Sequence, residues 1–452
     1  MRSTLRDVVA RIIGSYRGLP PTIYALFLAR VVTALGAFVF PFLTLTLTAR
    51  LKLSEAEAGA TLTLVVLCSV AGSLLGGWLS DHLPKRQVLF GGQLLAGAAT
   101  LAAGFVHDSP RLIPLLLVAM VGFGVVSPAL SSLVAEVTPR ARRRDAYSLG
   151  HLGANVGFSV GPLLAGFLFH SYPQWLFWGD GLTTLLAAVV VQVGTRGASP
   201  HREPEAPQAV GPQGGGAAGA QVTDAEANVE GSVWSILRAR PQLIAYSALS
   251  ILLAMSYEQV NFTLPVTLSD LFHEGGAGRF GVVMSANGVC VLLLTPLITA
   301  LASADDHLTG LKRAGLCYGV GFGAFALLAP AAALDPLTGG AATWALLLLS
   351  TLIWTTGEIF SVNHGSAFVA QESPASHRGR VSGALSLAAG LMRALSPTLS
   401  GALLPLIGAG GVWGLVLLMG LAAGAGFEWT RRRWPSAAPP LERAPTAPLT
   451  AS

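Results

Sequence analysis

Long apolar stretches recur along the whole chain and are separated by short polar connectors. A helix of ~20 mostly apolar residues is long enough to cross a bilayer. The connectors carry turn signals such as "HDSP" and "LDPLTGG". The pattern therefore predicts an all-α polytopic membrane protein with twelve transmembrane helices. The predicted spans are 22–48, 56–80, 87–106, 112–135, 146–170, 174–195, 243–271, 280–301, 313–334, 342–370, 380–407 and 411–429.

The longest connector divides these spans into two sets of six. It is rich in Pro, Gly and Ala and cannot bury a core, so it is predicted to be largely disordered. The two sets resemble each other weakly: Pro41 matches Pro265, and Pro162 matches Pro397. We expect two pseudo-symmetric six-helix bundles with a substrate site between them near mid-membrane. The predicted divisions are an N-terminal bundle at 1–195, a cytoplasmic linker at 196–242, a C-terminal bundle at 243–430 and a cytoplasmic tail at 431–452.

The distribution of charge predicts the orientation of the chain. Only 11% of the 452 residues are charged, against about 25% in soluble proteins, which excludes a soluble multidomain enzyme. If the N-terminus lies inside, the inner segments hold 22 of the 28 Lys and Arg residues. The positive-inside rule then predicts both termini in the cytoplasm, most simply in a bacterial inner membrane. The net charge of +5 reflects this topology, and no nucleic-acid partner is expected.

Motifs for other classes of protein are absent from the sequence. The three cysteines, Cys68, Cys290 and Cys317, have no metal-ligand spacing, so neither a metal nor a cofactor is expected. There is no phosphate-binding loop for a primary pump and no nucleophile–base pair for an enzyme. A removable signal peptide is not expected, because the basic first twenty residues lack an apolar core.

The connector between the second and third spans reads "GWLSDHLPKR" over residues 77–86. It resembles the signature of the major facilitator superfamily in the same loop, although His82 and Pro84 depart from the pattern. The matching residues are Gly77, Asp81, Lys85 and Arg86. The resemblance implies that Gly77 allows close helix approach and that Asp81 accepts hydrogen bonds from the opposite half. It also implies that Lys85 and Arg86 pair with Glu136 and so latch the cytoplasmic side.

The fifth span contains "GFSVGPLLAG", which resembles a motif of proton-coupled drug exporters in that superfamily. Its matching residues are Gly157, Gly161, Pro162 and Gly166, whereas Ala165 replaces a glycine. Two glycines four residues apart permit close packing, and a proline can bend a helix. The sequence "WTTGE" at 354–358 also resembles these exporters. Val118 occupies the position where they often carry an arginine, which weakens the usual assignment of the proton relay.

Four ionisable residues fall near the middle of predicted spans: Arg30, Glu258, Glu358 and Arg393. Each costs ~2.5–3.5 kcal/mol at the centre of a helix, so each needs a partner or a hydrated cavity. Glu258 and Glu358 are the candidates for proton coupling, and the two arginines would neutralise them while the site is empty. The alternative is that these residues form structural ion pairs. If Glu258 were permanently paired with Arg30, proton coupling through it would fail.

Polar residues in the same spans are candidates for the substrate cavity, although each is equally compatible with a hydrogen bond between helices. The candidates are Arg30, Asn155, Tyr257, Gln259, Asn261, Asn363 and Arg393. Asp180 lies beside Trp175 and Trp178, a pattern typical of the membrane interface.

The resemblance and the charges together predict a secondary transporter that exports amphipathic or cationic compounds against protons by alternating access. The expected partners are a small-molecule substrate, protons and the lipid bilayer, and the expected state is a monomer. One alternative is a proton-coupled carrier of a specific polar metabolite such as a peptide, sugar or organic acid, whose anionic group Arg30 and Arg393 would bind. A second is a membrane receptor or scaffold that transports nothing.

Overall fold

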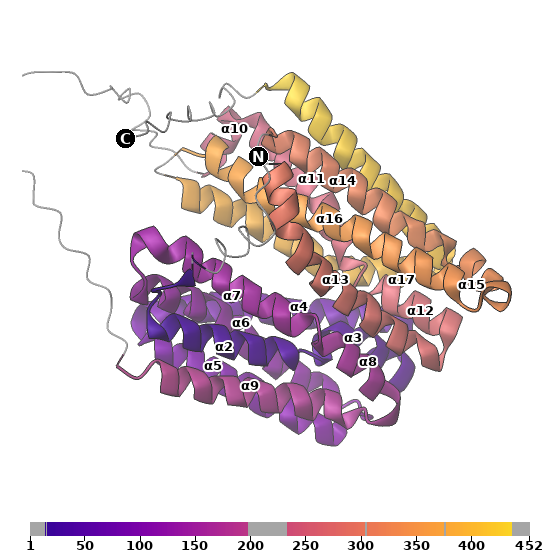
Figure 1. Cartoon of the computed structure of the whole chain (residues 1–452), viewed down its shortest axis with the longest axis horizontal. Coiled ribbons are helices and arrows are strands. Elements are labelled where there is room, and N and C mark those ends of the chain that lie inside the picture. Colours follow the sequence, from indigo (N-terminus) through magenta and orange to yellow (C-terminus); the bar gives the residue numbers. More distant parts are fainter. Residues whose placement is uncertain (1–13, 15, 198–232, 303–304, 375–376, 436–452) are drawn as a thin grey trace, which may run out of the picture. The chain divides into compact units, whose positions relative to one another are not determined.

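The computed structural model describes residue 14 and residues 16–197, 233–302, 305–374 and 377–435. Within these residues every regular element is a helix and no strand occurs (Figure 1). Most of the linker predicted to be disordered, and of the cytoplasmic tail, lies outside the described residues. The division of the chain into domains at that linker therefore stays a prediction.

The first half of the chain begins with a span made of two helices, α2 and α3, and a π-helical turn, η1. A span that pairs α7 with α8 follows later. The helices are α2 (Pro21–Leu35), α3 (Val39–Leu45), η1 (Thr46–Arg50), α4 (Glu55–His82), α5 (Lys85–Ala103), η2 (Gly104–Val106), α6 (Leu112–Val137), η3 (Arg140–Arg142), α7 (Arg143–Phe158), α8 (Gly161–Ser171) and α9 (Gln174–Gly194).

The second half begins with a short helix, α10. Its helices are α10 (Val233–Ala239), α11 (Pro241–Glu258), α12 (Thr263–Phe272), α13 (Glu274–Leu301), α14 (His307–Gly323), η5 (Ala324–Leu327), α15 (Leu328–Thr338), α16 (Ala341–Glu372) and α17 (Arg378–Arg433).

Eleven segments in the described residues are long and apolar enough to cross a membrane. The last of them, α17, has 56 residues and contains a non-helical residue, Gly408, with φ 67° and ψ 170°. A continuous helix of that length would measure about 84 Å, whereas the apolar core of a bilayer is about 30 Å thick. Gly408 therefore separates two spans, and the prediction of an all-α membrane protein with twelve spans is confirmed.

The described helices belong to two compact units. Unit 1 comprises residues 1–223, 258–292 and 393–412, and unit 2 comprises residues 224–257, 293–392 and 413–452. In unit 1, α4 packs on α6, α5 packs on α6 and α9, and α2 packs on α7 and α9 (Figure 1). In unit 2, α14 and α15 pack on α16. The units cross the predicted boundary between bundles, because parts of the seventh, eighth and eleventh spans belong to unit 1.

Close packing in unit 1 depends on glycines that face a neighbouring backbone. A Cβ atom at Gly76 would lie 2.6 Å from the carbonyl oxygen of Val125, and one at Gly72 would lie 2.2 Å from that of Val121. A Cβ atom at Gly77 would meet nothing within 4 Å. The close helix approach that the sequence motif implied at Gly77 is therefore found one residue earlier, where α4 meets α6.

Residues of unit 1 that come from the second half of the chain pack tightly on the first half. A Cβ atom at Gly401 would lie 2.3 Å from the carbonyl oxygen of Glu55. Thr63 and Thr398 share a hydrogen bond of 2.7 Å, and Ser285 Oγ accepts one of 3.0 Å from the backbone N–H of Leu163. Since membrane helices associate through small residues and polar contacts rather than hydrophobicity, these contacts hold the segments together.

Three spans break near their middle into two α-helices joined by non-helical residues, and the ninth passes through the 3-10 turn η5 between α14 and α15. The three breaks position the polar residues. The first span breaks between α2 and α3, and the seventh between α11 and α12. Pro41 is the third residue of α3, and Pro265 is the third residue of α12. The fifth span breaks between α7 and α8, where Pro162 is the second residue of α8. In contrast, Pro397, the predicted counterpart of Pro162, lies inside a continuous stretch of α17.

Candidate functional site

The carboxylate of Glu258 lies at the break in the seventh span. Glu258 is the last residue of α11 and only 4% of its surface is exposed. The side-chain amide of Asn261 donates a hydrogen bond of 3.1 Å to Glu258 Oε1, and Arg393 is close enough to stabilise the carboxylate electrostatically. Arg30 makes no hydrogen bond or ion pair with Glu258 in the described structure. The pairing that would have excluded Glu258 from proton coupling is therefore not formed.

Gln259, the next residue, joins the seventh span to α17. Its amide nitrogen donates to Ser396 Oγ at 3.0 Å, and its amide oxygen accepts from Thr263 Oγ1 at 2.5 Å and from Ser400 Oγ at 2.9 Å. These contacts satisfy a buried amide within unit 1. In this structure Gln259 links the start of α12 to α17, and its predicted contact with substrate remains a prediction.

Unit 2 contains a second polar contact at the corresponding part of its own helices. The hydroxyl of Tyr257 donates a hydrogen bond of 3.2 Å to Glu358 Oε1 on α16. The ring of Tyr257 packs edge-on against Trp354, with the ring centroids 6.0 Å apart. The neighbour of Glu358 is thus the neutral hydroxyl of Tyr257. The neighbours of Glu258 are instead the amide of Asn261 and the guanidinium of Arg393.

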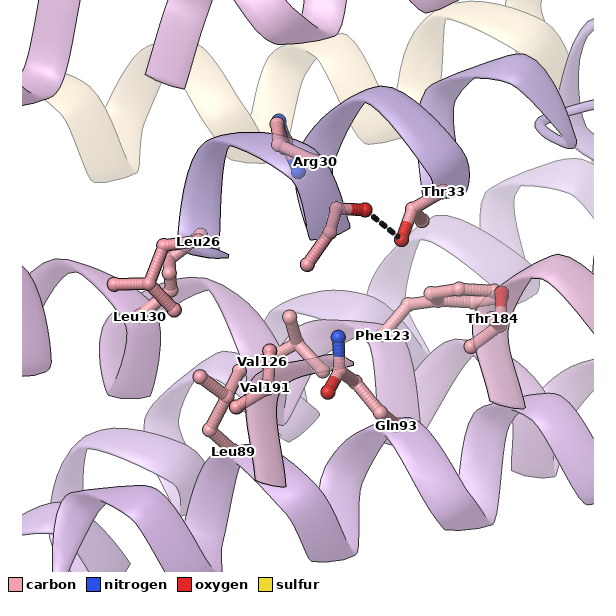
Figure 2. A pocket seen from close by; sticks show the side chains of 11 residues that line it. Leu26, Arg30, Thr33, Leu89, Gln93, Phe123, Val126, Leu130, Thr184 and Val191 are labelled. Carbon is pink, nitrogen blue, oxygen red and sulfur yellow. Dashed lines mark hydrogen bonds between the residues drawn. The ribbon is translucent and has the colours of Figure 1, made fainter. Parts of the chain in front are cut away.

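Arg30 lies on α2 and lines two adjoining cavities of unit 1. One has a volume of about 170 Å³ and is also lined by Phe27, Tyr147 and His151. The other has a volume of about 30 Å³ and is lined by Gln93 and Thr184 among others (Figure 2). Arg30 is exposed and forms no hydrogen bond or ion pair with the residues that the structure describes. Neither cavity is lined by an acidic residue.

Gln93 was not a candidate from the sequence. It lies on α5 in the smaller cavity, 6% exposed, and Figure 2 shows its amide turned toward α2. Its amide oxygen is buried and has no hydrogen-bond partner in the described structure. In the sequence Gln93 stands out only as an amide inside an apolar span. The sequence does not show whether that amide has hydrogen-bond partners.

Asp180 is buried within unit 1, and its predicted position at the membrane interface stays a prediction. It is 5% exposed and accepts a hydrogen bond of 3.2 Å from the backbone N–H of Val39, the first residue of α3. It also lines a cavity of about 290 Å³ with Thr33 and Phe123, which both line the small Arg30 cavity too. The carboxylate of Asp180 thus accepts a hydrogen bond from a backbone N–H that the break in the first span leaves without a partner in the helix.

The connector between α4 and α5 adopts part of the arrangement that the family resemblance implied. Lys85 Nζ lies 2.7 Å from Glu136 Oε2. Arg86 does not pair with that carboxylate; instead its guanidinium donates to the side-chain and backbone oxygens of Gln192 at 3.0 and 2.6 Å. The motif therefore ties α5 to α6 through one cation and to α9 through the other. Asp81 is exposed at the end of α4.

The motif in the fifth span packs against two other spans of unit 1. A Cβ atom at Gly157 would lie 2.6 Å from the Cβ of Ala34, and one at Gly161 would lie 2.8 Å from the carbonyl oxygen of Leu35. A Cβ atom at Gly166 would lie 2.8 Å from the carbonyl oxygen of Ala277 on α13. The glycines bring the interrupted fifth span close to the interruption in the first.

Two predicted cavity residues make local or helix–helix contacts. The amide of Asn155 donates to the carbonyl oxygen of His151 in its own helix at 3.1 Å. The amide of Asn363 donates to Thr299 Oγ1 at 3.0 Å in unit 2. Of the predicted ionisable residues, the structure brings Glu258 and Arg393 together, while Arg30 lies in cavities that neither of them lines.

Comparison with known proteins agrees with this architecture. A Na(+), Li(+), K(+)/H(+) antiporter of Planococcus maritimus is 23% identical over 383 residues, which are 80% of this chain and 84% of the antiporter. A 3-(3-hydroxy-phenyl)propionate transporter of Escherichia coli is 30% identical over 121 residues, 27% of this chain and 30% of that protein. The crystal structure of the peptide transporter POT in complex with sulfate shares the fold, with a TM-score of 0.72 and 16% identity over 94% of this chain and 98% of that one. The family model described as Major Facilitator Superfamily matches residues 26–397. The chain therefore belongs to the Major Facilitator Superfamily and is a secondary transporter of that type.

Proposed function

We propose that this transporter exports small amphipathic organic compounds in exchange for protons, and that Glu258 is the carboxylate that binds and releases the proton. The proposal rests on one observation: a nearly buried carboxylate lies at a break within a membrane span, with an arginine and an amide as its neighbours. An ionisable group inside a membrane span is expensive to keep and marks an ion or substrate pathway by default. Interrupted helices at mid-membrane are where transporters of this kind bind ions and substrates.

The surroundings of Glu258 suggest how the proton acts. While the carboxylate is charged, Arg393 compensates it. When Glu258 takes up a proton, that attraction is lost, and the guanidinium of Arg393 becomes available to another anion. The contacts of Gln259 hold the adjacent backbone in place during this change. A proton and a cationic group of a substrate then compete for the Glu258 carboxylate, which is the requirement for exchange, whereas an anion at Arg393 binds together with the proton.

The similarity to a cation/proton antiporter over 80% of the chain supports exchange against protons. The salt bridge between Lys85 and Glu136 supports a role for the connector in closing the cytoplasmic side. Alternating access then opens the site to each side in turn, as the inverted and parallel repeats of such transporters allow. We place the protein in the bacterial inner membrane as a monomer with both termini in the cytoplasm.

A second candidate is the proton-coupled carriage of an organic acid. The specific observation that favours it is Arg30, a cation within a span whose cavities have no acidic lining. The relative that transports 3-(3-hydroxy-phenyl)propionate supports the same class of substrate. The two candidates differ in the direction of transport and in the charge of the substrate, and both use Glu258 for the proton.

Glu258→Gln tests the proposal in proteoliposomes. We expect wild-type protein to carry at least one compound of a mixed panel of lipophilic cations and aromatic acids faster when a pH gradient is imposed. Glu258→Gln should keep exchange at equal pH on both sides but lose the acceleration by the gradient, because its side chain cannot exchange a proton. Flux of labelled compound and the signal of a pH-sensitive dye inside the vesicles measure both properties.

Glu274→Gln is the matched control, since Glu274 is exposed at the first residue of α13. It should behave like the wild type. Acceleration by the gradient that is unchanged in Glu258→Gln would remove this residue from the coupling mechanism. In that case Glu358, bonded to Tyr257, becomes the carboxylate to replace next.

A further inference from the structure

The larger cavity beside Arg30 has the size and walls of a site for one aromatic ring. Its volume is about 170 Å³, and an apolar cavity of about 150 Å³ is known to hold benzene. Phe27 contributes from α2 and Tyr147 from α7. The hydroxyl of Tyr147 donates a hydrogen bond of 2.9 Å to the carbonyl oxygen of Ser131, so its ring is held in the wall. The rest of the lining is mixed: it includes the aliphatic side chains of Ile23 and Leu130 and the polar residues Ser127, Ser131 and His151.

The charge of this cavity is positive and uncompensated. Arg30 has no hydrogen-bond or ion-pair partner among the described residues, and no carboxylate lines either of its cavities. This contrasts with Arg393, which has Glu258 as its neighbour. A guanidinium in a membrane span needs a compensating anion or water. The planar fork of the guanidinium matches the two oxygens of a carboxylate.

Gln93 lines the smaller cavity, of about 30 Å³, which Arg30 also lines. Figure 2 shows its amide nitrogen turned toward α2 and its amide oxygen turned away. The volume of this cavity is sufficient for a group of the size of a water molecule or a hydroxyl. The amide nitrogen of Gln93 can donate a hydrogen bond to such a group.

We propose that the cavities beside Arg30 form the binding site for an aromatic carboxylate of one ring. The carboxylate binds the guanidinium of Arg30, the ring lies between Phe27 and Tyr147, and a hydroxyl or water accepts a hydrogen bond from the amide nitrogen of Gln93. This inference names the substrate class of the proposed transporter and rests on that proposed function. Such a compound is an organic acid, so it belongs to the second candidate function and excludes a cationic substrate at this position.

Equilibrium binding to the purified full-length protein tests the site without any gradient. The probes are benzoate, the uncharged isostere benzamide and the cation benzylamine, measured by titration calorimetry in detergent. Wild-type protein should bind benzoate at least about tenfold more tightly than either other probe, because only the carboxylate compensates Arg30. Arg30→Gln should lose at least about tenfold in affinity for benzoate while its affinity for benzamide is unchanged. Arg30→Lys should fall between the two, because it keeps the charge and loses the fork.

Arg111→Gln is the control, since Arg111 is an exposed arginine that precedes α6 and lines neither cavity. It should bind benzoate like the wild type. Benzamide or benzylamine binding as tightly as benzoate, no detectable binding of benzoate, or full benzoate affinity in Arg30→Gln would overturn the site. The folding of Arg30→Gln is judged by its elution in size-exclusion chromatography and its thermal unfolding. If this variant does not fold, the relative affinities of the wild type for the three probes still test the proposed site.

The result is separable from the test of proton coupling. Arg30-dependent benzoate binding together with unchanged coupling in Glu258→Gln would refute the proposed role of Glu258 and keep the aromatic acid site. Loss of coupling in Glu258→Gln without any preference for benzoate would refute the site and keep the role of Glu258.

Discussion

At the scale of single residues, Asp180 has a role that can be separated from transport. Its carboxylate accepts a hydrogen bond from the backbone N–H of Val39, which is 3% exposed and begins α3. If the side chain of Asp180 is removed, the buried N–H group of Val39 loses this acceptor. A buried donor left unsatisfied costs about 1–3 kcal/mol.

Asp180→Ala should therefore lower the thermal stability of the protein in detergent. We expect a clear drop in the unfolding temperature followed by tryptophan fluorescence, corresponding to a loss of about 1–3 kcal/mol. Asp108→Ala is the control, because the side chain of Asp108 is 58% exposed and its ion pair with Arg50 is a surface contact of little value. Equal unfolding temperatures for the two variants would show that Asp180 does not stabilise the break.

Sequence reasoning at this scale found the charged residues but not all of their partners. Arg30, Glu258, Glu358 and Arg393 stand out because ionisable residues are rare in apolar spans. The partner of Arg86 is Gln192, 106 positions along the chain, and no local pattern identifies a contact over such a separation. Gln93 is visible as a polar residue, whereas its missing partner is a property of the packed structure.

At the scale of the helices, neighbouring glycines have opposite surroundings. Gly76 faces the backbone of α6, and Gly77 faces open space. A mid-helix glycine is about 0.8–1.0 kcal/mol less favourable than alanine, so adding a methyl group helps wherever there is room. Where a backbone atom lies in the way, the helices must separate, and such overpacking costs about 1–3 kcal/mol.

Gly76→Ala should destabilise the protein, and Gly77→Ala should leave its stability unchanged or slightly higher. The two variants are matched controls for each other, since they differ by one position on the same helix. Thermal unfolding monitored by the retained monodisperse peak in size-exclusion chromatography measures the difference. A destabilised Gly77→Ala beside a stable Gly76→Ala would contradict the packing of α4 on α6.

The sequence predicted the existence of the spans better than their interruptions. Long apolar runs report burial in lipid directly, so the ends of the spans lie within a few residues of the predictions. Hydropathy says nothing about backbone geometry, and proline alone does not decide it. Pro162 follows a break between α7 and α8, while Pro397 lies within the helical part of α17. The difference depends on the neighbours of each helix and not on the local sequence.

At the scale of the whole molecule, the orientation in the membrane is predicted from the distribution of charge alone. The predicted inner segments hold 22 of the 28 basic residues, and the predicted outer connectors hold four. In both halves of the chain, most basic residues lie in the predicted inner segments. A reversal of the chain would place nearly all of these cations on the side from which the positive-inside rule excludes them.

Cysteine labelling in intact cells should reveal this orientation. Cys68, Cys290 and Cys317 are first replaced by serine, and single cysteines are then placed at two exposed positions, Arg111→Cys and Arg144→Cys. A membrane-impermeant maleimide should label the first variant from outside and the second only after permeabilisation. Labelling in the opposite order would refute both the orientation and the assignment of the Lys85 connector to the cytoplasmic side.

Unit 1 has a consequence for how the protein is made. It is assembled from three separate stretches of chain, and the last of them ends at residue 412 of 452. Its first six spans are therefore synthesised and inserted long before the segments that pack on Gly59 and Gly166 leave the ribosome. During that interval the nascent protein has an incomplete surface of small residues facing lipid. Completion of unit 1 is a late event of biogenesis, and chains that are released early expose that surface to the quality-control proteases of the membrane.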